Sequence, residues 1–496
     1  MAQISVSHLT FAYEGSYDNI FEDVSFRIDT DWRLGFIGRN GRGKTTFLNL
    51  LLGKYPYHGT ISAPVDFSYF PFLIADKSLP ASEIAESVCP MVQPWELLRE
   101  MDRLKLTEDV LKRPFGTLSN GEQTKLLLCL LFLKENRFLL IDEPTNHLDL
   151  HGRGIVSRYL SSKKGFILVS HDRAFLDGCI DHVLSINKAD IEIQQGNYTT
   201  WKENRDRQDA FEWDENEKLL KEINRLRRSA AEKAQWAEKS EREKIGADPS
   251  KVDVKIGRRP WLGEKSRKAN QRAKAIEGRQ EAAIEEKTGL LKNLERAFPV
   301  KIIQTPFSGS TLIELRNVSL YYGNHQICSD ISFEVKPGGR IALTGKNGCG
   351  KTTLLKLLCG QDVSYTGSVV RPDRLKISYI PQDASGMHGT LTEYAHEWGI
   401  DEERFRAMLG KLDFTAPQYR NRIENYSDGQ KKKVLLARSL CEDANLFIWD
   451  EPLNFVDILS RIQIENAILN YKPTIIFVEH DKIFCERTAT RIIEIR

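Results

Sequence analysis

The same series of short motifs occurs twice in this chain of 496 residues. Four residues that mark the motifs recur at offsets of 307, 308, 308 and 309 residues: Lys44 as Lys351, Ser119 as Ser427, Asp142 as Asp450, and His171 as His480. An offset that is so regular over four separate motifs indicates a duplicated domain. We therefore predict a first domain over residues 1–198, a second over 300–496, and a different segment over 199–299 between them.

Composition and hydropathy narrow the class of protein. Apolar residues make up 41% and charged residues 28% of the chain, which is typical of globular proteins. The longest strongly apolar stretch, residues 126–133, is far shorter than the ~18 residues that span a bilayer, and the N-terminus shows no export signal. The eight cysteines lack CxxC spacing, which argues against a zinc site and a disulfide framework. We expect a cytoplasmic protein without a membrane-spanning segment.

The segment between the two copies is rich in Glu, Lys, Arg and Ala and has helical periodicity. Apolar residues follow a heptad-like seam in both of its halves, and glycines and prolines cluster between them. This pattern predicts that residues 199–299 form an antiparallel α-helical hairpin with its tip near 245–261. At ~1.5 Å per residue, such a tip could stand roughly 55 to 65 Å from the two domains.

Charge is concentrated in part of this segment. Residues 221–280 contain 18 Lys and Arg against 9 Asp and Glu, so their net charge is +9, whereas the whole chain carries +2 and the remainder therefore −7. Such a run is either a solvated helix face or a surface for nucleic acid. The motifs described next favour the second interpretation.

Both copies contain a glycine-rich turn that matches GxxxxGK[ST]. In each copy the turn follows a short apolar strand, residues 33–37 or 340–344, and precedes a helix, as in α/β domains. Backbone N–H groups of such a loop surround phosphates, and its lysine reaches the β and γ oxygens. A single match could be a fortuitous turn, but two in register predict an ATP site in each copy. The predicted binding residues are Gly38, Asn40, Gly41, Gly43, Lys44, Thr45 and Thr46, and Gly345, Asn347, Gly348, Gly350, Lys351, Thr352 and Thr353.

Two apolar strands each deliver a pair of carboxylates at one end, Asp142-Glu143 and Asp450-Glu451. In phosphoryl transfer the aspartate can hold magnesium, together with Thr45 or Thr352, while the glutamate can polarise the attacking water. An acidic turn after a strand is common once but improbable twice at matched spacing. We therefore predict two Mg-ATP sites in which Glu143 and Glu451 are catalytic.

Leu118-Ser119-Asn120-Gly121-Glu122-Gln123 and Tyr426-Ser427-Asp428-Gly429-Gln430-Lys431 resemble the signature motif of ATP-binding cassette proteins. The resemblance implies that two cassettes dock head to tail, so that the serine and glycine of each signature meet the γ-phosphate bound by the other cassette. It also assigns three further roles: His171 and His480 as catalytic switch histidines, Tyr13 and Tyr322 as adenine-stacking aromatics, and Gln382 as the magnesium-sensing glutamine of the second cassette. In the first cassette Phe72 stands where that glutamine is expected, so the two sites are predicted to turn over differently.

The string Glu143-Pro144-Thr145-Asn146-His147-Leu148-Asp149 is similar to that of the ABC-F branch, and Gly196-Asn197-Tyr198 resembles the start of its interdomain linker. The resemblance implies a monomer with paired cassettes that acts on the ribosome at the tRNA exit site, where residues 221–280 contact 23S rRNA and P-site tRNA rather than DNA or a membrane. The spacings of 75 and 76 residues between lysine and signature serine leave no room for an extra arm, and we expect no C-terminal extension.

These features are similar to the Lsa-like group of antibiotic-resistance ABC-F proteins. That resemblance implies protection of the peptidyl-transferase centre against lincosamides, pleuromutilins and streptogramin A. A housekeeping ABC-F translation factor that gates elongation is the alternative. The ATPase subunit of a membrane transporter is a third reading, but a basic helical hairpin between cassettes has no role in that class.

Overall fold

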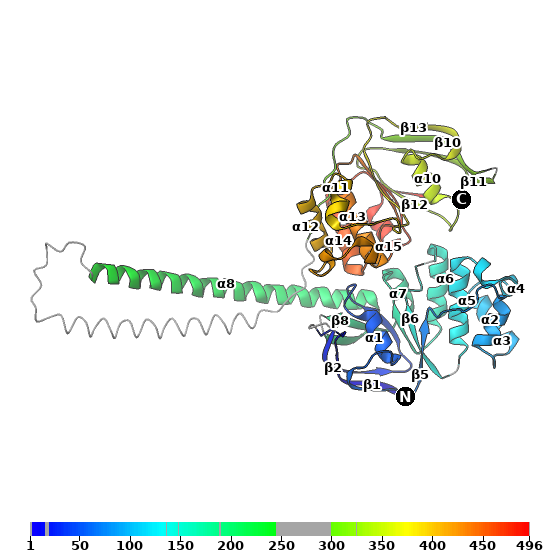
Figure 1. The fold of residues 1–496 in the computed structure, drawn as a ribbon, viewed down its shortest axis with the longest axis horizontal. Helices are drawn as coiled ribbons and strands as arrows, with labels where there is room; N and C mark the ends of the chain where they lie inside the picture. The colour runs from blue at the N-terminus through cyan, green and yellow to red at the C-terminus, as the bar shows by residue number, and fades with distance from the viewer. Residues whose placement is uncertain are drawn as a thin grey trace, which may run out of the picture. The chain divides into compact units, whose positions relative to one another are not determined.

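The computed structural model describes residues 2–14, 19–134, 136–146, 148–187, 190–244, 299–323 and 325–495 (Figure 1). We refer to the described residues up to 197 as cassette 1 and to those from 299 as cassette 2. Both cassettes belong to one compact unit, and a second unit begins at Lys202. The second arm and the tip of the predicted hairpin, together with His147, lie outside the described residues.

Cassette 1 alternates strands and helices in the order expected for an α/β domain. Its elements are β1 (Gln3–Phe11), β2 (Phe21–Asp29), β3 (Arg33–Ile37), α1 (Lys44–Leu51), β4 (His58–Ser62), β5 (Asp66–Phe70), α2 (Ala81–Val88), α3 (Pro94–Arg103), α4 (Asp109–Lys112), α5 (Asn120–Phe132), β6 (Arg137–Asp142), α6 (Leu150–Ser161), β7 (Phe166–Val169), α7 (Arg173–Cys179), β8 (His182–Asn187) and β9 (Asp190–Gln195).

Cassette 2 repeats this order with small changes in length. Its elements are β10 (Ile313–Tyr322), β11 (His325–Val335), β12 (Arg340–Thr344), α10 (Lys351–Leu358), β13 (Ser364–Val370), β14 (Ile377–Ile380), α11 (Leu391–Glu397), α12 (Glu402–Lys411), α13 (Asp428–Cys441), β15 (Leu446–Asp450), α14 (Ile458–Tyr471), β16 (Ile475–Val478), α15 (Lys482–Thr488) and β17 (Arg491–Glu494).

Each cassette is built around a mainly parallel sheet, with strand order β5-β6-β7-β3-β8-β9 in cassette 1 and β14-β15-β16-β12-β17 in cassette 2. The order is not sequential, because β7 lies between β3 and β6, and β16 lies between β12 and β15. Parallel strands that are connected through helices end at the same edge of their sheet. The glycine-rich loop after β3 and the carboxylates after β6 are therefore brought to one edge, and β12 and β15 do the same in cassette 2.

The parallel sheet of cassette 1 is covered on both faces. Successive side chains of a strand point to opposite faces, so they pack in two different cores. On β6, Phe138 and Leu140 pack in the core formed with the antiparallel sheet β2-β1-β4 and helix α1. Leu139 and Ile141 pack on the other face, against α5 and the neighbouring helices. Cassette 2 has the same two cores, the first of which includes the antiparallel sheet β11-β10-β13.

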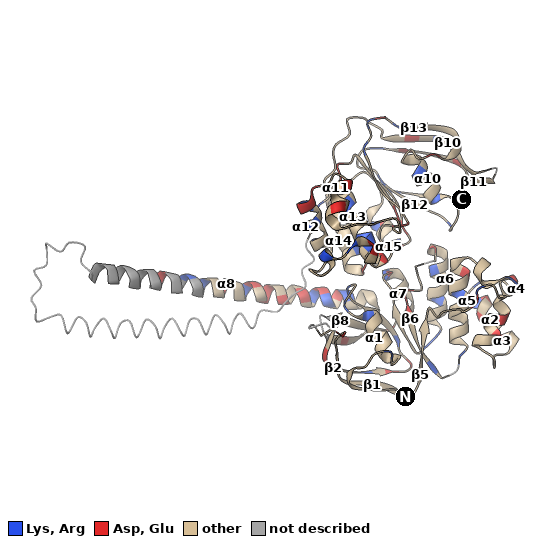
Figure 2. Cartoon of the chain, viewed as in Figure 1, with Lys and Arg blue, Asp and Glu red and all other residues tan. Residues whose placement is uncertain are grey.

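Helix α8 (Tyr198–Lys244) follows β9 and begins the linker. Acidic and basic side chains alternate along its described part, as Figure 2 shows. Several form ion pairs one turn apart within the helix, including Arg205 with Asp209 at 3.0 Å and Lys221 with Glu217 at 2.7 Å. Such pairs support an exposed helix.

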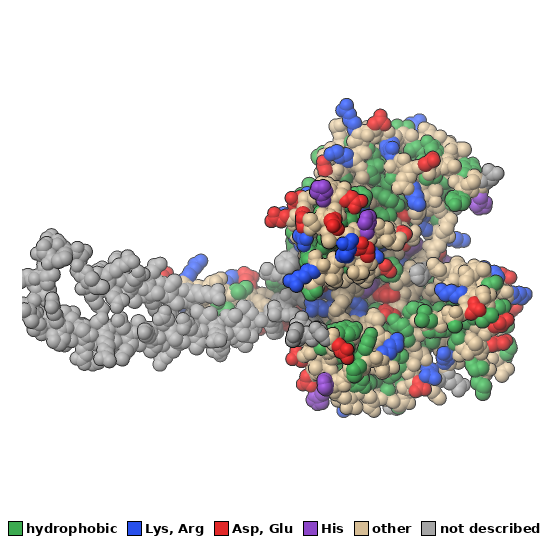
Figure 3. All heavy atoms as spheres, in the orientation of Figure 1, with side chains coloured by type: hydrophobic (Ala, Val, Ile, Leu, Met, Phe, Trp, Pro, Cys, Tyr) green, Lys and Arg blue, Asp and Glu red, His purple; other side chains and the backbone are tan. Residues whose placement is uncertain are grey.

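The described residues contain no helix that is both long enough and apolar enough to span a bilayer. On the face drawn in Figure 3, acidic and basic side chains are interspersed with hydrophobic ones over both cassettes. Neither sign of charge dominates that face.

Candidate functional site: two composite nucleotide sites

The glycine-rich loops have the backbone that the motif requires. Gly43 has a φ of 95°, a left-handed conformation, and an added Cβ would lie 2.5 Å from Cγ2 of Ile20. Gly350 is the same, with a φ of 94° and an added Cβ 2.7 Å from Cγ2 of Ile327. Because only glycine fits such a position without strain, both loops turn sharply into the helix that begins at the motif's lysine, Lys44 or Lys351.

The two lysines fold back over these loops. Lys44 donates to the carbonyl oxygens of Gly38 at 2.6 Å and Arg39 at 3.1 Å. Lys351 donates to the carbonyls of Gly345 at 2.9 Å and Lys346 at 2.8 Å. Both ammonium groups therefore lie in the space that the loop encloses, where phosphate oxygens would be held.

The predicted magnesium ligands lie next to these loops. The Thr45 hydroxyl donates to Oδ2 of Asp142 at 3.0 Å. In cassette 2 both carboxylate oxygens of Asp450 are buried and lack a hydrogen bond of normal geometry within the described residues. Burial raises the pKa of Asp450 to about 6, although the nearby Thr352 hydroxyl favours its charged form. A buried carboxylate beside a threonine hydroxyl fits a hard divalent cation such as Mg²⁺.

Each predicted catalytic glutamate is paired with its predicted switch histidine. Nε2 of His171 lies 3.3 Å from Oε1 of Glu143, and Nε2 of His480 lies 3.2 Å from Oε1 of Glu451. Both glutamates have left-handed backbones, with φ of 49° and 47°. Such conformations are costly for residues other than glycine and occur often at functional sites.

The two glutamates differ in their electrostatic surroundings. Burial, reinforced by the charge of Asp142, raises the pKa of Glu143 to about 8. Burial would also raise the pKa of Glu451, but hydrogen bonds from His480 and Gln382 outweigh it and hold that pKa below its usual value. The glutamine that cassette 1 lacks is therefore part of what distinguishes the two carboxylates.

The signature serines begin helices α5 and α13. The hydroxyl of Ser119 accepts from the Glu122 N–H at 3.2 Å, and that of Ser427 accepts from the Gln430 N–H at 3.4 Å. In each case the side chain at the third helical position reaches back to the serine N–H, which completes a capping box. The serines are thus fixed at helix N-termini, where the helix dipole favours anions.

Residues of both cassettes line each cavity at these loops. Site 1 is a cavity of about 500 Å³ that combines the cassette 1 loop with the cassette 2 signature, and site 2, of about 810 Å³, has the reverse combination. The predicted residues that line site 1 are Asn40, Gly41, Lys44, Thr45, Asp142, Glu143, His171, Ser427 and Gly429. Those that line site 2 are Ser119, Gly121, Asn347, Gly348, Gly350, Lys351, Thr352, Thr353, Gln382, Glu451 and His480.

The other predicted residues do not line either cavity: Tyr13, Gly38, Gly43, Thr46, Tyr322, Gly345 and Asp450. The Tyr13 hydroxyl forms a 2.8 Å hydrogen bond with the Thr46 hydroxyl, which keeps this ring beside the first loop. Tyr322 is 83% exposed. Phe72 packs against the apolar core of cassette 1, whereas the Tyr69 hydroxyl donates to Oδ2 of Asp142 at 2.9 Å. Tyr69 of β5 thus contacts the carboxylate that the expected magnesium-sensing glutamine would approach.

Direct bonds join the cassettes at these sites. Nδ2 of Asn40 donates to the carbonyl of Phe455 at 2.8 Å. Nη1 of Arg153 donates to the carbonyl of His480 at 3.1 Å and to Oδ2 of Asp172 at 2.8 Å. The switch histidine of site 2 is thus bonded through its backbone to cassette 1.

Several lining residues were not predicted from the motifs. They are Tyr69, Pro71, Asp413, Phe414, Gln418, Lys433 and Phe455 in site 1, and Lys125, Asn146, Asp149 and His325 in site 2. Asn146 and Asp149 belong to the Glu-Pro-Thr-Asn string, so extending that motif to its last residue would have found them. Phe455 belongs to the corresponding string of cassette 2, and Tyr69 and Pro71 to the segment of Phe72, whereas Asp413, Phe414 and Gln418 come from a segment with no motif of its own.

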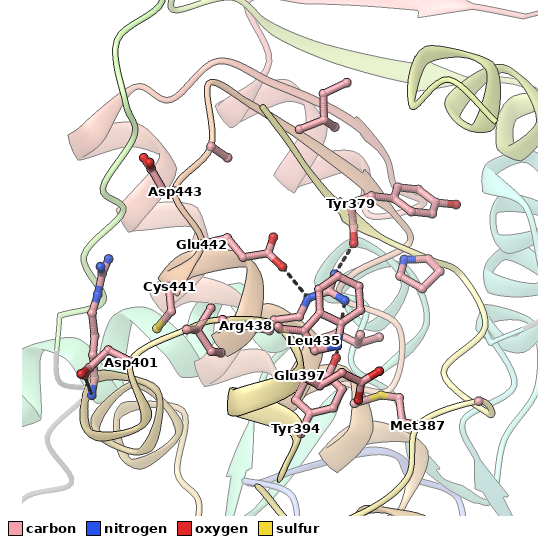
Figure 4. A pocket seen from close by; sticks show the side chains of 18 of the residues that line it. Tyr379, Met387, Tyr394, Glu397, Asp401, Leu435, Arg438, Cys441, Glu442 and Asp443 are labelled. Atoms are coloured by element: carbon pink, nitrogen blue, oxygen red, sulfur yellow. Dashed lines mark hydrogen bonds and ion pairs between the residues drawn. The ribbon is translucent and has the colours of Figure 1, made fainter. Parts of the chain in front are cut away.

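A further cavity of about 750 Å³ in cassette 2 lies away from the loops (Figure 4). Its buried Arg438 sits over the Trp398 ring at 3.9 Å, pairs with Glu442 at 3.1 Å and donates to the Tyr379 carbonyl. Arg438 lies on α13, which Ser427 caps, and Tyr379 lies on β14, shortly before Gln382. This arginine therefore ties the signature helix to the strand that leads to Gln382.

The family model described as ABC transporter matches residues 21–146 and 328–454, once in each cassette. The ribosome protection protein VmlR of Bacillus subtilis (strain 168) is 28% identical over 492 residues, which cover 96% of this chain and 84% of the relative. The energy-dependent translational throttle protein EttA of Mycobacterium tuberculosis (strain ATCC 25618 / H37Rv) is also 28% identical, over 96% of this chain and 88% of its own.

A further relative is the ABC transporter F family member 2 of Arabidopsis thaliana, 25% identical over 99% of this chain and 76% of the relative. Among solved structures, the archaeal ribosome recycling factor aABCE1, in its complex with ribosomal stalk protein aP1, has a TM-score of 0.63 at 19% identity and covers 98% of this chain and 87% of its own. That likeness concerns the fold.

The duplicated match confirms the predicted α/β class with two tandem ATPase domains. The loops, carboxylates and signatures of both copies meet in two composite cavities. The chain belongs to the ABC transporter family and is an ATP-hydrolysing, two-cassette protein of its ABC-F group.

Proposed function

We propose that this ATPase binds the ribosome at the tRNA exit site and protects the peptidyl-transferase centre from lincosamides, pleuromutilins and streptogramin A. The observation that carries the proposal is the α8 helix of 47 residues, which leaves cassette 1 and leads into the basic segment. Its base is internally paired, but Arg225 and Arg228 are exposed and have no acidic partner among the described residues. Arginines of this kind suit RNA phosphates.

In this proposal, ATP binding and hydrolysis at the two nucleotide sites drive the cycle of ribosome binding and release. Lys44 and Lys351 would hold the β and γ phosphates of ATP, and the threonine and aspartate of each cassette would hold magnesium, which neutralises charge on the phosphates. Glu143 and Glu451 would polarise the attacking water, each oriented by its histidine. The opposite signature would contact the γ-phosphate, so that bound ATP closes the cassettes and hydrolysis releases them.

The linker would act on ribosomal RNA. Residues 221–280, with a net charge of +9, would contact 23S rRNA and the backbone of P-site tRNA. In this proposal ATP binding stabilises the ribosome-bound form, and the linker tip displaces or disfavours the drug. The protein would act in the cytoplasm as a monomer whose own two cassettes form both sites.

The main alternative is a housekeeping translation factor that gates elongation. It is favoured by the relatives named translational throttle proteins, one of which is as identical to this chain as VmlR, at 28%. Both functions use the same ATPase sites and the same basic linker. They differ in whether the protein changes drug susceptibility.

The test is expression of the chain in a drug-susceptible Gram-positive host, with minimum inhibitory concentrations measured for the three drug classes. We expect higher values than in the empty-vector strain, and loss of that increase when Glu143 and Glu451 are both replaced by Gln. Cosedimentation of the double variant with ribosomes in ATP provides the control for binding. Ribosome binding without resistance to any drug of that centre would favour the translation factor. Absence of ribosome binding, with a permease encoded beside the gene, would favour a transporter subunit.

A further inference from the structure

An ion pair joins the two cassettes beside site 1. Nη1 of Arg39, the residue after the first glycine of the cassette 1 loop, lies 2.9 Å from Oδ1 of Asp413 in cassette 2. The two side chains are only 12% and 28% exposed. A pair with this shielding is screened less by solvent than a fully exposed one.

The backbone fixes the position of Asp413. Helix α12 ends at Lys411, and Asp413 follows in a left-handed conformation with a φ of 68°. Its N–H bonds to the carbonyl of Gly410 at 3.2 Å, and the next N–H, of Phe414, bonds to that of Leu409 at 3.0 Å. The carboxylate therefore projects from a rigid helix end.

Cassette 1 has the same helix end with the opposite charge. Helix α3 ends at Arg103, and Lys105 follows with a φ of 54°. The N–H of Lys105 bonds to the carbonyl of Asp102 at 2.9 Å, and that of Leu106 to Met101 at 3.0 Å. The backbone is thus repeated, while the carboxylate of Asp413 is replaced by an ammonium group.

The loop of site 2 carries a basic residue at the position of Arg39. This residue is Lys346, and no acidic side chain lies within ion-pair distance of it in the part of the chain that the structure describes. Closure of site 2 by the movement that forms the Arg39–Asp413 pair at site 1 would bring Lys105 towards Lys346. Like charges at short distance repel.

The volumes of the two cavities also indicate that the cassettes are closer together at site 1 than at site 2. Asp413, Phe414 and Gln418 line site 1, which measures about 500 Å³. The corresponding segment of cassette 1 does not line site 2, which measures about 810 Å³. The smaller cavity, site 1, is therefore the one beside the inter-cassette ion pair. The helix end that lines it carries the carboxylate of Asp413, which attracts Arg39.

We propose that Arg39 and Asp413 are positioning residues that hold the cassette 2 signature over the cassette 1 loop, and that Lys105 and Lys346 deny site 2 the same contact. Site 1 then retains nucleotide longer, and the cassettes separate first at site 2. Arg39 and Asp413 do not contact the reacting atoms. They act by setting the distance between Ser427 and the phosphates bound by Lys44. This inference concerns ATP handling and is independent of the ribosomal function.

Release of a fluorescent nucleotide from the isolated full-length protein tests the proposal. The Glu143→Gln, Glu451→Gln double variant is loaded with N-methylanthraniloyl-ATP and magnesium, and release is followed after addition of excess ATP. We expect two phases, the slower from site 1. Asp413→Asn removes the charge but keeps a residue that tolerates the left-handed corner, and should accelerate the slow phase about fivefold.

Five further variants give the expected order of effects. Asp413→Lys should accelerate the slow phase more than Asp413→Asn, because it adds repulsion. Arg39→Lys keeps the pair and should leave the slow phase nearly unchanged, whereas Arg39→Gln should match Asp413→Asn. Lys105→Asp creates the missing attraction to Lys346 and should slow the fast phase. Glu403→Gln, at an exposed position of α12, makes the same charge change as Asp413→Asn without touching the loop and should alter neither phase.

Three results would overturn the proposal. Release in a single phase from the parent protein would show that the sites do not differ. Equal acceleration of both phases by Asp413→Asn would mean that this residue supports the fold of cassette 2 and does not close site 1. An unchanged fast phase in Lys105→Asp would show that charge at this corner does not govern closure.

Discussion

Nε2 of His480 lies 3.2 Å from Oε1 of Glu451, and the N–H of Glu451 is itself bonded to β16, the strand that precedes His480, at the carbonyl of Val478. The strained backbone of Glu451 and the ring of His480 are therefore held by adjacent strands of one sheet. In cassette 1 the N–H of Glu143 is likewise bonded to the neighbouring strand, but Nε2 of His171, 3.3 Å from Oε1 of Glu143, hydrogen-bonds Oδ1 of Asn40 at 3.1 Å. This geometry suits a carboxylate that must keep a fixed orientation towards a water molecule.

Replacing both glutamates by Gln should abolish turnover while leaving ATP bound. Glutamine preserves size and hydrogen bonding but cannot accept a proton. We expect phosphate release to fall at least about 100-fold, within the range typical of general-base loss, with nucleotide still retained on a desalting column. Near-normal phosphate release would remove Glu143 and Glu451 from the mechanism.

The two single variants should differ. Gln382 contributes to the environment of Glu451, whereas cassette 1 has Phe72 in the corresponding segment, and the partly buried Phe72 ring packs against the apolar core. Glu451→Gln should therefore slow a single turnover far more than Glu143→Gln. Equal losses in the two variants would show that Phe72 is no handicap. Single-turnover rates are the appropriate measure, because coupling between sites blurs steady-state values.

Stability should depend on pH through Glu100, a buried carboxylate at the end of α3. Burial alone would raise its pKa, but Lys163 and Tyr159 donate to the carboxylate and hold the pKa of Glu100 below its usual value. A lowered folded-state pKa stabilises the protein above about pH 4.3, and this contribution is lost as the pH falls through the folded-state value.

Glu100→Gln should therefore lower stability at pH 7 by about 1–3 kcal/mol, the usual cost of weakening a buried charged hydrogen bond. The gap in melting temperature between wild type and variant should narrow as the pH falls below the ordinary pKa of a glutamate, because protonation of Glu100 removes this contribution. Glu83→Gln, at an exposed position of α2, is the control. A gap of the same size at every pH would contradict this assignment.

The basic linker should make ribosome binding strongly dependent on salt, because each Lys or Arg that contacts a phosphate releases counterions. Reversing the charge of six residues should weaken cosedimentation and flatten its salt dependence: Arg225, Arg227, Arg228, Arg267, Lys268 and Arg272. Reversal of Lys202 and Lys218, which are paired within α8 and lie outside residues 221–280, is the control and should change binding less. Unchanged binding in the six-residue variant would mean that these charges only solvate a helix.

Deletion of residues 248–259 should erase drug protection while sparing ATP hydrolysis. The deleted segment includes the basic residues Lys251, Lys255, Arg258 and Arg259, next to Trp261, which can stack on a base. Minimum inhibitory concentrations and phosphate release are measured on the same variant. Intact resistance would assign protection to the cassettes or to the helices. Loss of both properties would point to misfolding, which ribosome binding in ATP would reveal.

The α/β class and the duplication could be predicted from sequence because each rests on a local pattern that occurs twice. The glycine-rich loop needs a left-handed Gly43, and the signature serine needs the first turn of a helix, so a few neighbouring residues specify each element. The composite sites then follow only if the two copies face each other, which the family resemblance supplied.

Contacts between distant segments could not be predicted in this way. Asp413 follows a helix with no motif, and its role depends on Arg39, which lies in the other cassette. The motif pattern marks Phe72, but the hydroxyl that donates to Asp142 in this segment belongs to Tyr69, three residues earlier. Such contacts depend on side-chain direction in the folded chain, and no local spacing in the sequence encodes them.

The bond from Arg153 to the carbonyl of His480, with the buried pair of Arg173 and Glu465 at 2.8 Å, keeps one cassette against the other on a single polypeptide. The effective concentration of each cassette around its partner is consequently fixed by the covalent link and not by the protein concentration. The formation of both nucleotide sites is then a first-order event, with no entropy cost of bringing two molecules together. For the proposed monomer, closure is therefore independent of the number of copies, and at a fixed ATP concentration the ATP-bound fraction should not change when the protein is diluted.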